Sequence, residues 1–449
     1  MDQIPPSDDQ LCKKSHKTNE QGCSVSLMST LGDDIFLEIL LRLPDFRCIV
    51  ECSYVCKRWF SIISRSKAYF SHRFNHYHRQ KRLCNSSSSS SSSPSLPFTL
   101  LFTNLAMIDH YFFAEQYISE RSKILHYGQE AALNFLPWKM YKNGLYLESS
   151  FEDLLLVGIY PKGCLFVCNP FTRQFVELPR SPNAFHRRSR YALVVSEYSK
   201  IKYKVVQIST EVDDITSVSP PFLLHLTIFS SETGQWSSST FNFPEVALFD
   251  RCSYRTPIVG SNGIVYWPYG VYKTEGLVAL DICSKQYHLV GLPRELGHDW
   301  RSLGSRIHVG VVRGKVRLAQ FFWYKRKQFF VFKAWELVDD DKMCNWNLVH
   351  YHDQMKMSEC CMSLSSLLTI HALHPDDGDV FFFSLSNKTL KAKEDIRIFQ
   401  CQMLGQNQSH IEILCNLPPK IYASRVSVVS LLHPWWPTQV PDLYHPTDI

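Results

Sequence analysis

The chain has 449 residues, of which 45% are hydrophobic and 20% are charged, and its net charge at pH 7 is +6. This apolar content is enough for packed domains and excludes a chain that is disordered throughout. A charge of +6 over such a length permits an acidic partner but does not by itself indicate a nucleic-acid-binding protein.

The first residues, MDQIPPSDDQLCKKSHK, contain no apolar stretch of the kind found in secretory signals. No run of 18 apolar residues occurs anywhere, so we expect no membrane span. The 15 cysteines are scattered and odd in number, which is typical of reduced thiols. We therefore expect a protein of the cytoplasm or the nucleus.

The segment from Leu31 to Phe70 contains three short helical patterns. Asp33 or Asp34 can cap the first helix, and Pro44 ends it because proline has no N–H to donate. Helices this short cannot bury all their apolar side chains among themselves. The surplus must contact the rest of the chain or another protein.

This segment resembles an F-box, the module that holds a Skp-family adaptor within a cullin-based ubiquitin ligase. The resemblance lies in Leu31, in the string from Ile39 to Pro44, and in the Val-Cys-Lys-Arg-Trp string that ends at Trp59. It departs from the family at Gly32, where proline is usual. The resemblance implies adaptor-binding roles for six residues, to which we add Ile35 for its apolar position: Leu31, Leu43, Pro44, Val55, Cys56 and Trp59.

The flanks of this module have a different composition. Residues 1–28 are polar and predict a disordered tail, so the helical module is placed at 29–75. A basic stretch at 72–82 is interpreted as a solvated helix end rather than a nucleic-acid site. The serine run from Ser86 to Ser93 cannot pack in a core, and a linker is therefore expected at 76–96.

Beyond this linker the pattern changes to short strands separated by turns, which we assign to one domain at 97–435 with a tail at 436–449. Five segments share the outline strand, polar turn, strand, and they begin near Gly163, Leu226, Leu277, Phe329 and Ile396. Hairpins repeated in this way predict the blades of a β-propeller, about six in number. The ring closes best if Phe98–Phe102 pairs with Val426–Leu432, because this pairing removes an exposed strand edge.

Two short motifs in this domain are similar to the kelch-like F-box-associated domain of plant F-box proteins. One is the Asn-Pro turn that begins at Asn169, and the other is the turn and strand from Gly260 to Trp267. The predicted fold class is therefore α+β and multidomain, a three-helix F-box followed by an all-β propeller. Aromatic and arginine residues at strand ends and loops are candidates for substrate binding, although each of them could equally pack in the core between blades: Trp267, Tyr269, Trp300, Arg301, Trp323 and Tyr324.

Metal-like spacings are present but weak. Cys52 and Cys56 precede His72 and His76 at distances compatible with zinc, yet the cysteines lie in helical patterns without a turn between them. The acidic run Asp376–Asp379 lacks the closing glutamate of a calcium loop and is interpreted as a turn. We predict no metal, no cofactor and no catalytic residue.

Together these features predict the substrate-recognition subunit of an SCF-type ubiquitin ligase, a non-catalytic receptor. Its partners would be a Skp-family adaptor, through it a cullin scaffold, and an unknown target protein. One alternative is a kelch-type propeller enzyme, an oxidase or a glycan hydrolase, which would need converging metal ligands or carboxylates. The other is a nucleic-acid binder acting through 72–82, which would bind with a steep dependence on salt.

Overall fold

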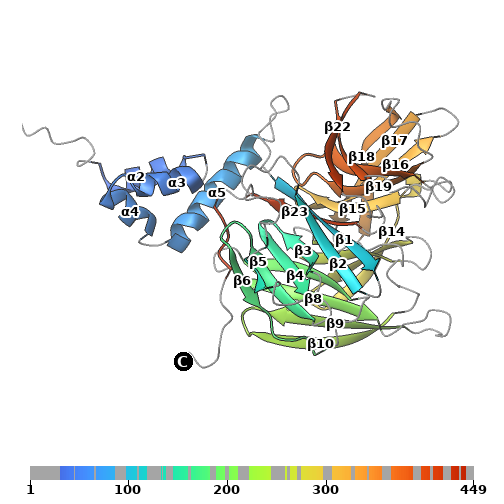
Figure 1. Ribbon diagram of the computed structural model, residues 1–449, viewed down its shortest axis with the longest axis horizontal. Coiled ribbons are helices and arrows are strands. Elements are labelled where there is room, and N and C mark those ends of the chain that lie inside the picture. Colours follow the sequence, from blue (N-terminus) through green and yellow to red (C-terminus); the bar gives the residue numbers. More distant parts are fainter. Residues whose placement is uncertain are drawn as a thin grey trace, which may run out of the picture. The chain divides into compact units, whose positions relative to one another are not determined.

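The computed structural model describes residues 31–44, 46–64, 67–85, 98–108, 111–118, 133, 135–137, 145–159, 163–182, 189–197, 202–210, 222–243, 258–259, 263–269, 275–296, 306–324, 329–340, 343–355, 366–387, 396–404, 408–417, 426–433 and 436–440. The chain divides into two compact units between Lys67 and Ala68. The helices come first in the sequence and are labelled in Figure 1: α2 (Asp33–Leu41), α3 (Phe46–Ser53), α4 (Lys57–Ser64) and α5 (Lys67–Asn85).

The three predicted helices of the first unit are present as α2, α3 and α4. Gly32, and not an aspartate, occupies the N-cap of α2, with an extended backbone and no side-chain cap. Asp33 and Asp34 lie in the first turn, where their negative charges are attracted to the positive end of the helix dipole. The predicted capping role of these aspartates is therefore wrong, because each lies one or two positions too far into the helix.

The small core of the first unit comes from one face of each helix. Its buried side chains are Phe36, Leu40 and Leu41 of α2, Ile49 of α3 and Ile63 of α4. The Trp59 ring packs edge-on against Phe36, with 5.8 Å between ring centroids.

Helix α5 extends well beyond the predicted end of the helical segment near residue 75. Phe70, Phe74 and His78 are spaced four residues apart and are all buried, so one face of the helix is anchored along most of its length. The predicted linker at 76–96 is therefore helical up to Asn85. Because α5 packs within the second unit, the boundary lies at Lys67, before the serine run, and residues 86–97 are outside the described part.

From β1 onward the described residues form five four-stranded antiparallel sheets and one three-stranded sheet. The three-stranded sheet contains β1 (Phe98–Ile108), β2 (Tyr111–Ile118) and β23 (Val426–Leu432). The first four-stranded sheet contains β3 (Leu145–Phe151), β4 (Leu154–Ile159), β5 (Cys164–Asn169) and β6 (Gln174–Glu177). The next contains β7 (Arg190–Glu197), β8 (Lys202–Thr210), β9 (Phe222–Ser230) and β10 (Gln235–Phe243).

The remaining three sheets follow in chain order. The first contains β11 (Ile258–Val259), β12 (Ile264–Tyr269), β13 (Gly276–Asp281) and β14 (Gln286–Gly291), followed by the short helix η3 (Arg294–Leu296). The second contains β15 (Arg306–Val312), β16 (Lys315–Tyr324), β17 (Phe329–Asp340) and β18 (Met343–Met355). The third contains β19 (Ser366–Leu373), β20 (Val380–Asn387), β21 (Ile396–Met403) and β22 (Ser409–Leu417).

These sheets are the blades of a propeller. The strands β3, β7, β11, β15, β19 and β23 each contact the next in turn, and β23 returns to β3, so they form the inner ring. The five predicted hairpins are the outer two strands of the five four-stranded blades. Buried apolar clusters fill the spaces between neighbouring blades, which is why a hairpin of marginal stability persists here.

The predicted closure of the ring is confirmed. Phe98 pairs with Leu432 and Asn104 pairs with Val426 in an unbroken antiparallel register, and β2 completes this blade from the other side of β1. Strands from both ends of the domain therefore share one sheet (Figure 1). No edge of the inner ring is left open among the described strands.

Candidate functional site

The helical module carries a large exposed apolar surface. Tyr54 is 83% exposed, Val55 67% and Phe60 58%, and further apolar side chains at Ile35, Ile39 and Val50 are also exposed. We call these six residues the apolar surface of the helical module. A small helical unit rarely presents so many large apolar groups to water unless another protein covers them.

The predicted adaptor-binding residues fall into two groups. Ile35, Pro44, Val55 and Cys56 are exposed, whereas Leu31, Leu43 and Trp59 are half-buried. Trp59 contributes part of its ring to the internal core through Phe36. Tyr54 and Phe60 were not predicted to bind the adaptor. Tyr54 follows α3 and Phe60 lies on α4, and both are large apolar residues that directly flank the Val-Cys-Lys-Arg-Trp string, which is a signal that the sequence contains.

Arg58, within the Val-Cys-Lys-Arg-Trp string, has an internal role. Its Nε donates to Asp33 Oδ1 at 2.8 Å, its Nη2 donates to the carbonyl of Leu31, and its guanidinium lies 4.5 Å from the centroid of the Phe36 ring. These contacts fasten the start of α4 to the start of α2. Arg58 thus holds the exposed residues around it in place.

Two of the substrate-binding candidates are core residues, which corrects the prediction. Trp267 and Tyr269 are 2% and 8% exposed and belong to the apolar cluster between the β7–β10 and β11–β14 blades. The alternation of β12 turns both side chains inward together with Val265.

The other four candidates cannot be placed on a surface. Trp323 and Tyr324 end β16, but their side chains are outside the described part. Trp300 and Arg301 lie outside the described residues.

The segment 436–440, predicted as a tail, is packed onto the second unit. Trp436 is buried against Phe70 and Phe74 of α5, with ring centroids 5.5 and 6.1 Å away. Asn75 Nδ2 donates to the Trp436 carbonyl at 3.3 Å, and the Trp436 N–H donates to Asn75 Oδ1 at 3.0 Å. We call residues 436–440 the C-terminal strap.

The other end of the strap is bound to the β3–β6 blade. The Thr438 N–H donates to Asp153 Oδ2, and Asn169 Nδ2 donates to both Asp153 Oδ2 and the Thr438 carbonyl, each at 2.7 Å. Asn169 Oδ1 also accepts from the N–H of Phe171 at 2.8 Å. The asparagine of the Asn-Pro turn therefore serves both its own turn and the strap. Burial raises the pKa of Asp153 to about 6, although the hydrogen bonds from Thr438 and Asn169 act to lower it.

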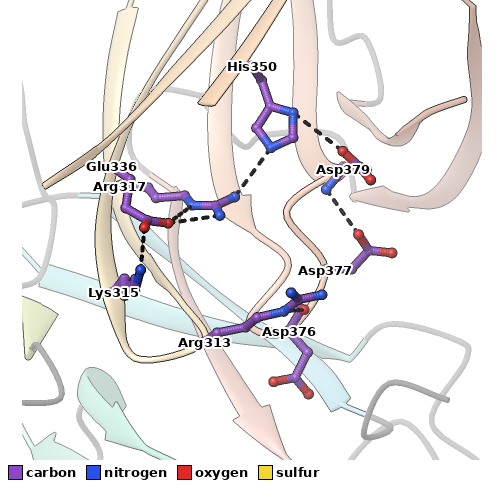
Figure 2. Close-up of polar contacts among 8 residues, drawn as sticks. All are labelled: Arg313, Lys315, Arg317, Glu336, His350, Asp376, Asp377 and Asp379. Carbon is purple, nitrogen blue, oxygen red and sulfur yellow. Dashed lines mark hydrogen bonds and ion pairs between the residues drawn. The ribbon is translucent and has the colours of Figure 1, made fainter. Parts of the chain in front are cut away.

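A second polar network joins the β15–β18 and β19–β22 blades (Figure 2). Arg317 donates to Glu336 Oε2 from Nε at 3.1 Å and from Nη2 at 2.9 Å, and Lys315 donates to Oε1 of the same carboxylate at 2.7 Å. Burial acts to raise the pKa of Glu336, but these hydrogen bonds outweigh it and hold the pKa below its usual value.

His350 extends this network to the turn between β19 and β20. Its ring lies 3.4 Å from Arg317 Nη1 and 3.3 Å from Asp379 Oδ1 (Figure 2). Burial lowers the pKa of His350 despite Asp379, so a neutral ring accepts from Arg317 and donates to Asp379. Asp376–Asp379 is a turn, as predicted, and Arg313 Nε donates to its Asp376 carbonyl at 2.7 Å. The network fastens two blades together.

No group of three or more metal-ligating side chains that could hold an ion occurs among the described residues. His72 and His76 lie on α5 with their rings stacked 6.2 Å apart. None of the helices in the described part is both long and apolar enough to cross a membrane.

Two family models match the chain. Residues 28–71 match the F-box domain, and residues 130–424 match the β-propeller of F-box proteins of the At3g26010-like kind. The chain therefore belongs to the F-box proteins with an At3g26010-like β-propeller.

Two F-box proteins from Arabidopsis thaliana are similar to this chain at low identity. F-box protein At3g26010 is 24% identical over 447 residues, which span 92% of this chain and 90% of the relative. F-box protein At5g49610 is 24% identical over 325 residues, which span 68% of this chain and 77% of the relative.

Proposed function

We propose that this chain is the substrate-recognition subunit of an SCF-type ubiquitin ligase, in the cytoplasm or the nucleus. Its helical module docks a Skp-family adaptor and through it a cullin scaffold, and its propeller binds the target protein. The observation that carries the proposal is the apolar surface of the helical module, within a segment that matches the F-box domain.

The physical basis of docking is the burial of that surface. Each apolar Å² removed from water contributes about 25 cal/mol, so covering several large side chains offsets the cost of association. The chain performs no chemical step in this scheme. It raises the effective concentration of target lysines beside the transferring enzyme.

The test is a pull-down of the full chain with a Skp-family adaptor, comparing wild type with Val55→Asp. Val55 is 67% exposed, so the substitution leaves the fold intact but places a charge in the interface. We expect at least about a tenfold loss of affinity, as for the loss of an interface hot spot. Leu404→Asp, at an exposed apolar residue of the propeller, is the matched control and should bind normally.

Two results would contradict the proposal. One is no binding by the wild-type chain. The other is equal binding by wild type and Val55→Asp, which would remove Val55 from the interface.

A further inference from the structure

The outer strand of the β15–β18 blade presents a group of large apolar side chains to solvent. Leu348, Val349 and Tyr351 of β18 are 48%, 38% and 54% exposed. Among the described side chains of the other outer strands, β6, β14 and β22 each have one exposed large apolar residue and β10 has none. Single apolar residues are ordinary on a protein surface, whereas three within four positions indicate an interaction site. We call Leu348, Val349 and Tyr351 the β18 apolar patch.

A β-bulge produces this patch. Leu348 of β18 pairs with Trp335 of β17. The next pair is His350 with Ala334, which leaves Val349 as an extra residue between the two pairs. In a regular strand, consecutive side chains point to opposite faces of the sheet. A bulge breaks this alternation and re-aims side chains, so Leu348 and Val349 are exposed together.

The strand that carries the patch is held firmly to the neighbouring blade. Trp346, two residues before Leu348, donates from Nε1 to the Gly291 carbonyl at the end of β14, at 2.7 Å. Cys344 and Trp346 also pack against the buried apolar cluster between the β11–β14 and β15–β18 blades. A partner that covers the patch therefore meets a pre-organised surface, which lowers the entropic cost of binding.

A half-buried cation borders the patch. Lys333 lies directly opposite Tyr351 in the register of β17 and β18, and its Nζ is 5.5 Å from the centroid of the Tyr351 ring. The ammonium donates to the Glu295 carbonyl at 3.3 Å, an acceptor without net charge. Lys333 forms no ion pair with any residue that the structure describes. An ammonium held only by neutral groups beside an apolar surface favours a ligand that supplies a carboxylate.

We propose that the β18 apolar patch, with Lys333 at its edge, docks a segment of the target protein that carries a carboxylate beside a large apolar side chain. The carboxylate pairs with Lys333, and the apolar side chain covers Leu348 and Tyr351. Side chains carry the recognition, because two register shifts interrupt β18 and such bulges weaken pairing with an added strand. This inference rests on the proposed function and deepens it by naming the docking surface and the chemistry of the target.

The experiment measures the retention of three pools of acetylated, amidated undecapeptides on the immobilised full chain. The first pool has a central glutamate with leucine two positions away on either side, and its other positions are random, uncharged and polar. Glutamine replaces the glutamate in the second pool, which removes the charge, and serine replaces both leucines in the third. We expect retention of the first pool to exceed that of either other pool by at least about fivefold, because the charge-assisted hydrogen bond and the burial of leucine both contribute.

Single substitutions assign each half of this preference. Lys333→Gln should retain the first and second pools equally, and Tyr351→Ser should retain the first and third pools equally. Tyr351 is more than half exposed, so its substitution leaves the fold intact and the test does not depend on Lys333→Gln alone.

Two matched controls should keep both preferences. Arg180→Gln removes an exposed cation that follows β6, and Ile413→Ser removes an apolar side chain of the outer strand β22 that is 53% exposed.

Three results would overturn the proposal. One is equal retention of the three pools by wild type, and another is survival of both preferences in Lys333→Gln and Tyr351→Ser. The third is a wild-type dimer in sedimentation that Leu348→Ser dissociates, which would assign the patch to a second copy of the chain. Adaptor binding is measured on the same preparations without peptide. Its absence in wild type would contradict the receptor function, whereas equal retention of the pools with adaptor binding intact overturns only the docking surface.

Discussion

Asn75 and Trp436 exchange two hydrogen bonds across 361 residues of sequence, at 3.3 and 3.0 Å. Asn75 lies on α5, the helix that leads into the propeller, and Trp436 begins the strap that ends the described chain. The side-chain amide of Asn75 thus bonds to both backbone polar groups of Trp436, as the backbone of a neighbouring strand would. These bonds connect the first helix of the second unit with the last described segment of the same unit.

Replacing Trp436 with alanine should loosen α5. The ring is buried against Phe70 and Phe74, so the variant loses both the burial and the edge-on aromatic contacts. Large-to-small substitutions of this kind cost about 3–5 kcal/mol. Hydrogen exchange should show faster exchange of the α5 amides, and Leu404→Ala, at an exposed residue, should leave them unchanged. Unchanged α5 protection in the Trp436 variant would show that the strap does not hold the helix.

Replacing Gly32 with proline should stabilise the start of α2. The φ of Gly32 is −67°, close to the value that a proline ring imposes. The gain comes from the unfolded chain, which loses conformational freedom, and should be about 0.4–1 kcal/mol. Gly32→Ala is the matched control, because any Cβ here meets Asp34 and only proline restricts φ. Slower exchange of α2 amides in the proline variant alone is the expected result, and equal exchange would contradict it.

A methyl group at Gly378 should disturb the network between two blades. A Cβ there would overlap Arg317 Nη1 and come within 3.2 Å of His350 Nε2, both already held by hydrogen bonds. Overpacking of this kind costs about 1–3 kcal/mol. Gly291→Ala is the control, since nothing lies within 4 Å of a Cβ at that position. In chemical denaturation, Gly378→Ala should unfold at a lower denaturant concentration than Gly291→Ala. Equal midpoints would show that the turn accommodates the methyl group without loss of stability.

Asp153 should make stability depend on pH. Its pKa is raised from 3.8 to about 6, chiefly by burial, so the folded state binds this proton more tightly than the unfolded state. The carboxyl therefore favours folding at low pH, and this contribution is lost as the pH rises through 6. Asp153→Asn keeps an oxygen acceptor and removes the charge. The free energy of unfolding of this variant, relative to wild type, should rise by about 1.4 kcal/mol between pH 5 and pH 8, because the folded-state pKa lies about one unit above pH 5, and a flat difference would contradict it.

Much of the fold could be read from local patterns. The five hairpins, the pairing of Phe98–Phe102 with Val426–Leu432 and the three helices from Leu31 onward each depend on residues close together in the chain, or on the need to close a ring. Hydrophobic period and turn residues report such features directly. The F-box resemblance rested on Leu31 and two short strings, and the family match to residues 28–71 confirms it.

Side-chain surroundings could not be read in the same way. The sequence left Trp267 and Tyr269 open between surface anchors and core residues, because aromatic residues serve both interfaces and cores. Only the packing of two blades shows that they are buried. Arg58 lies in a string that carries the F-box resemblance, and only the structure shows that it fastens α4 to α2.

The sequence by itself determined the order of the parts: a helical module, then a β-propeller closed by its own two ends. Only the tertiary structure decided that α5 and residues 436–440 belong to the propeller unit, because Asn75 and Trp436 are 361 positions apart and no local period links them. It also brought Glu148 beside Arg190, from two different blades. Contacts between segments distant in sequence depend on how whole sheets pack, and the pattern of one segment carries no record of its neighbour.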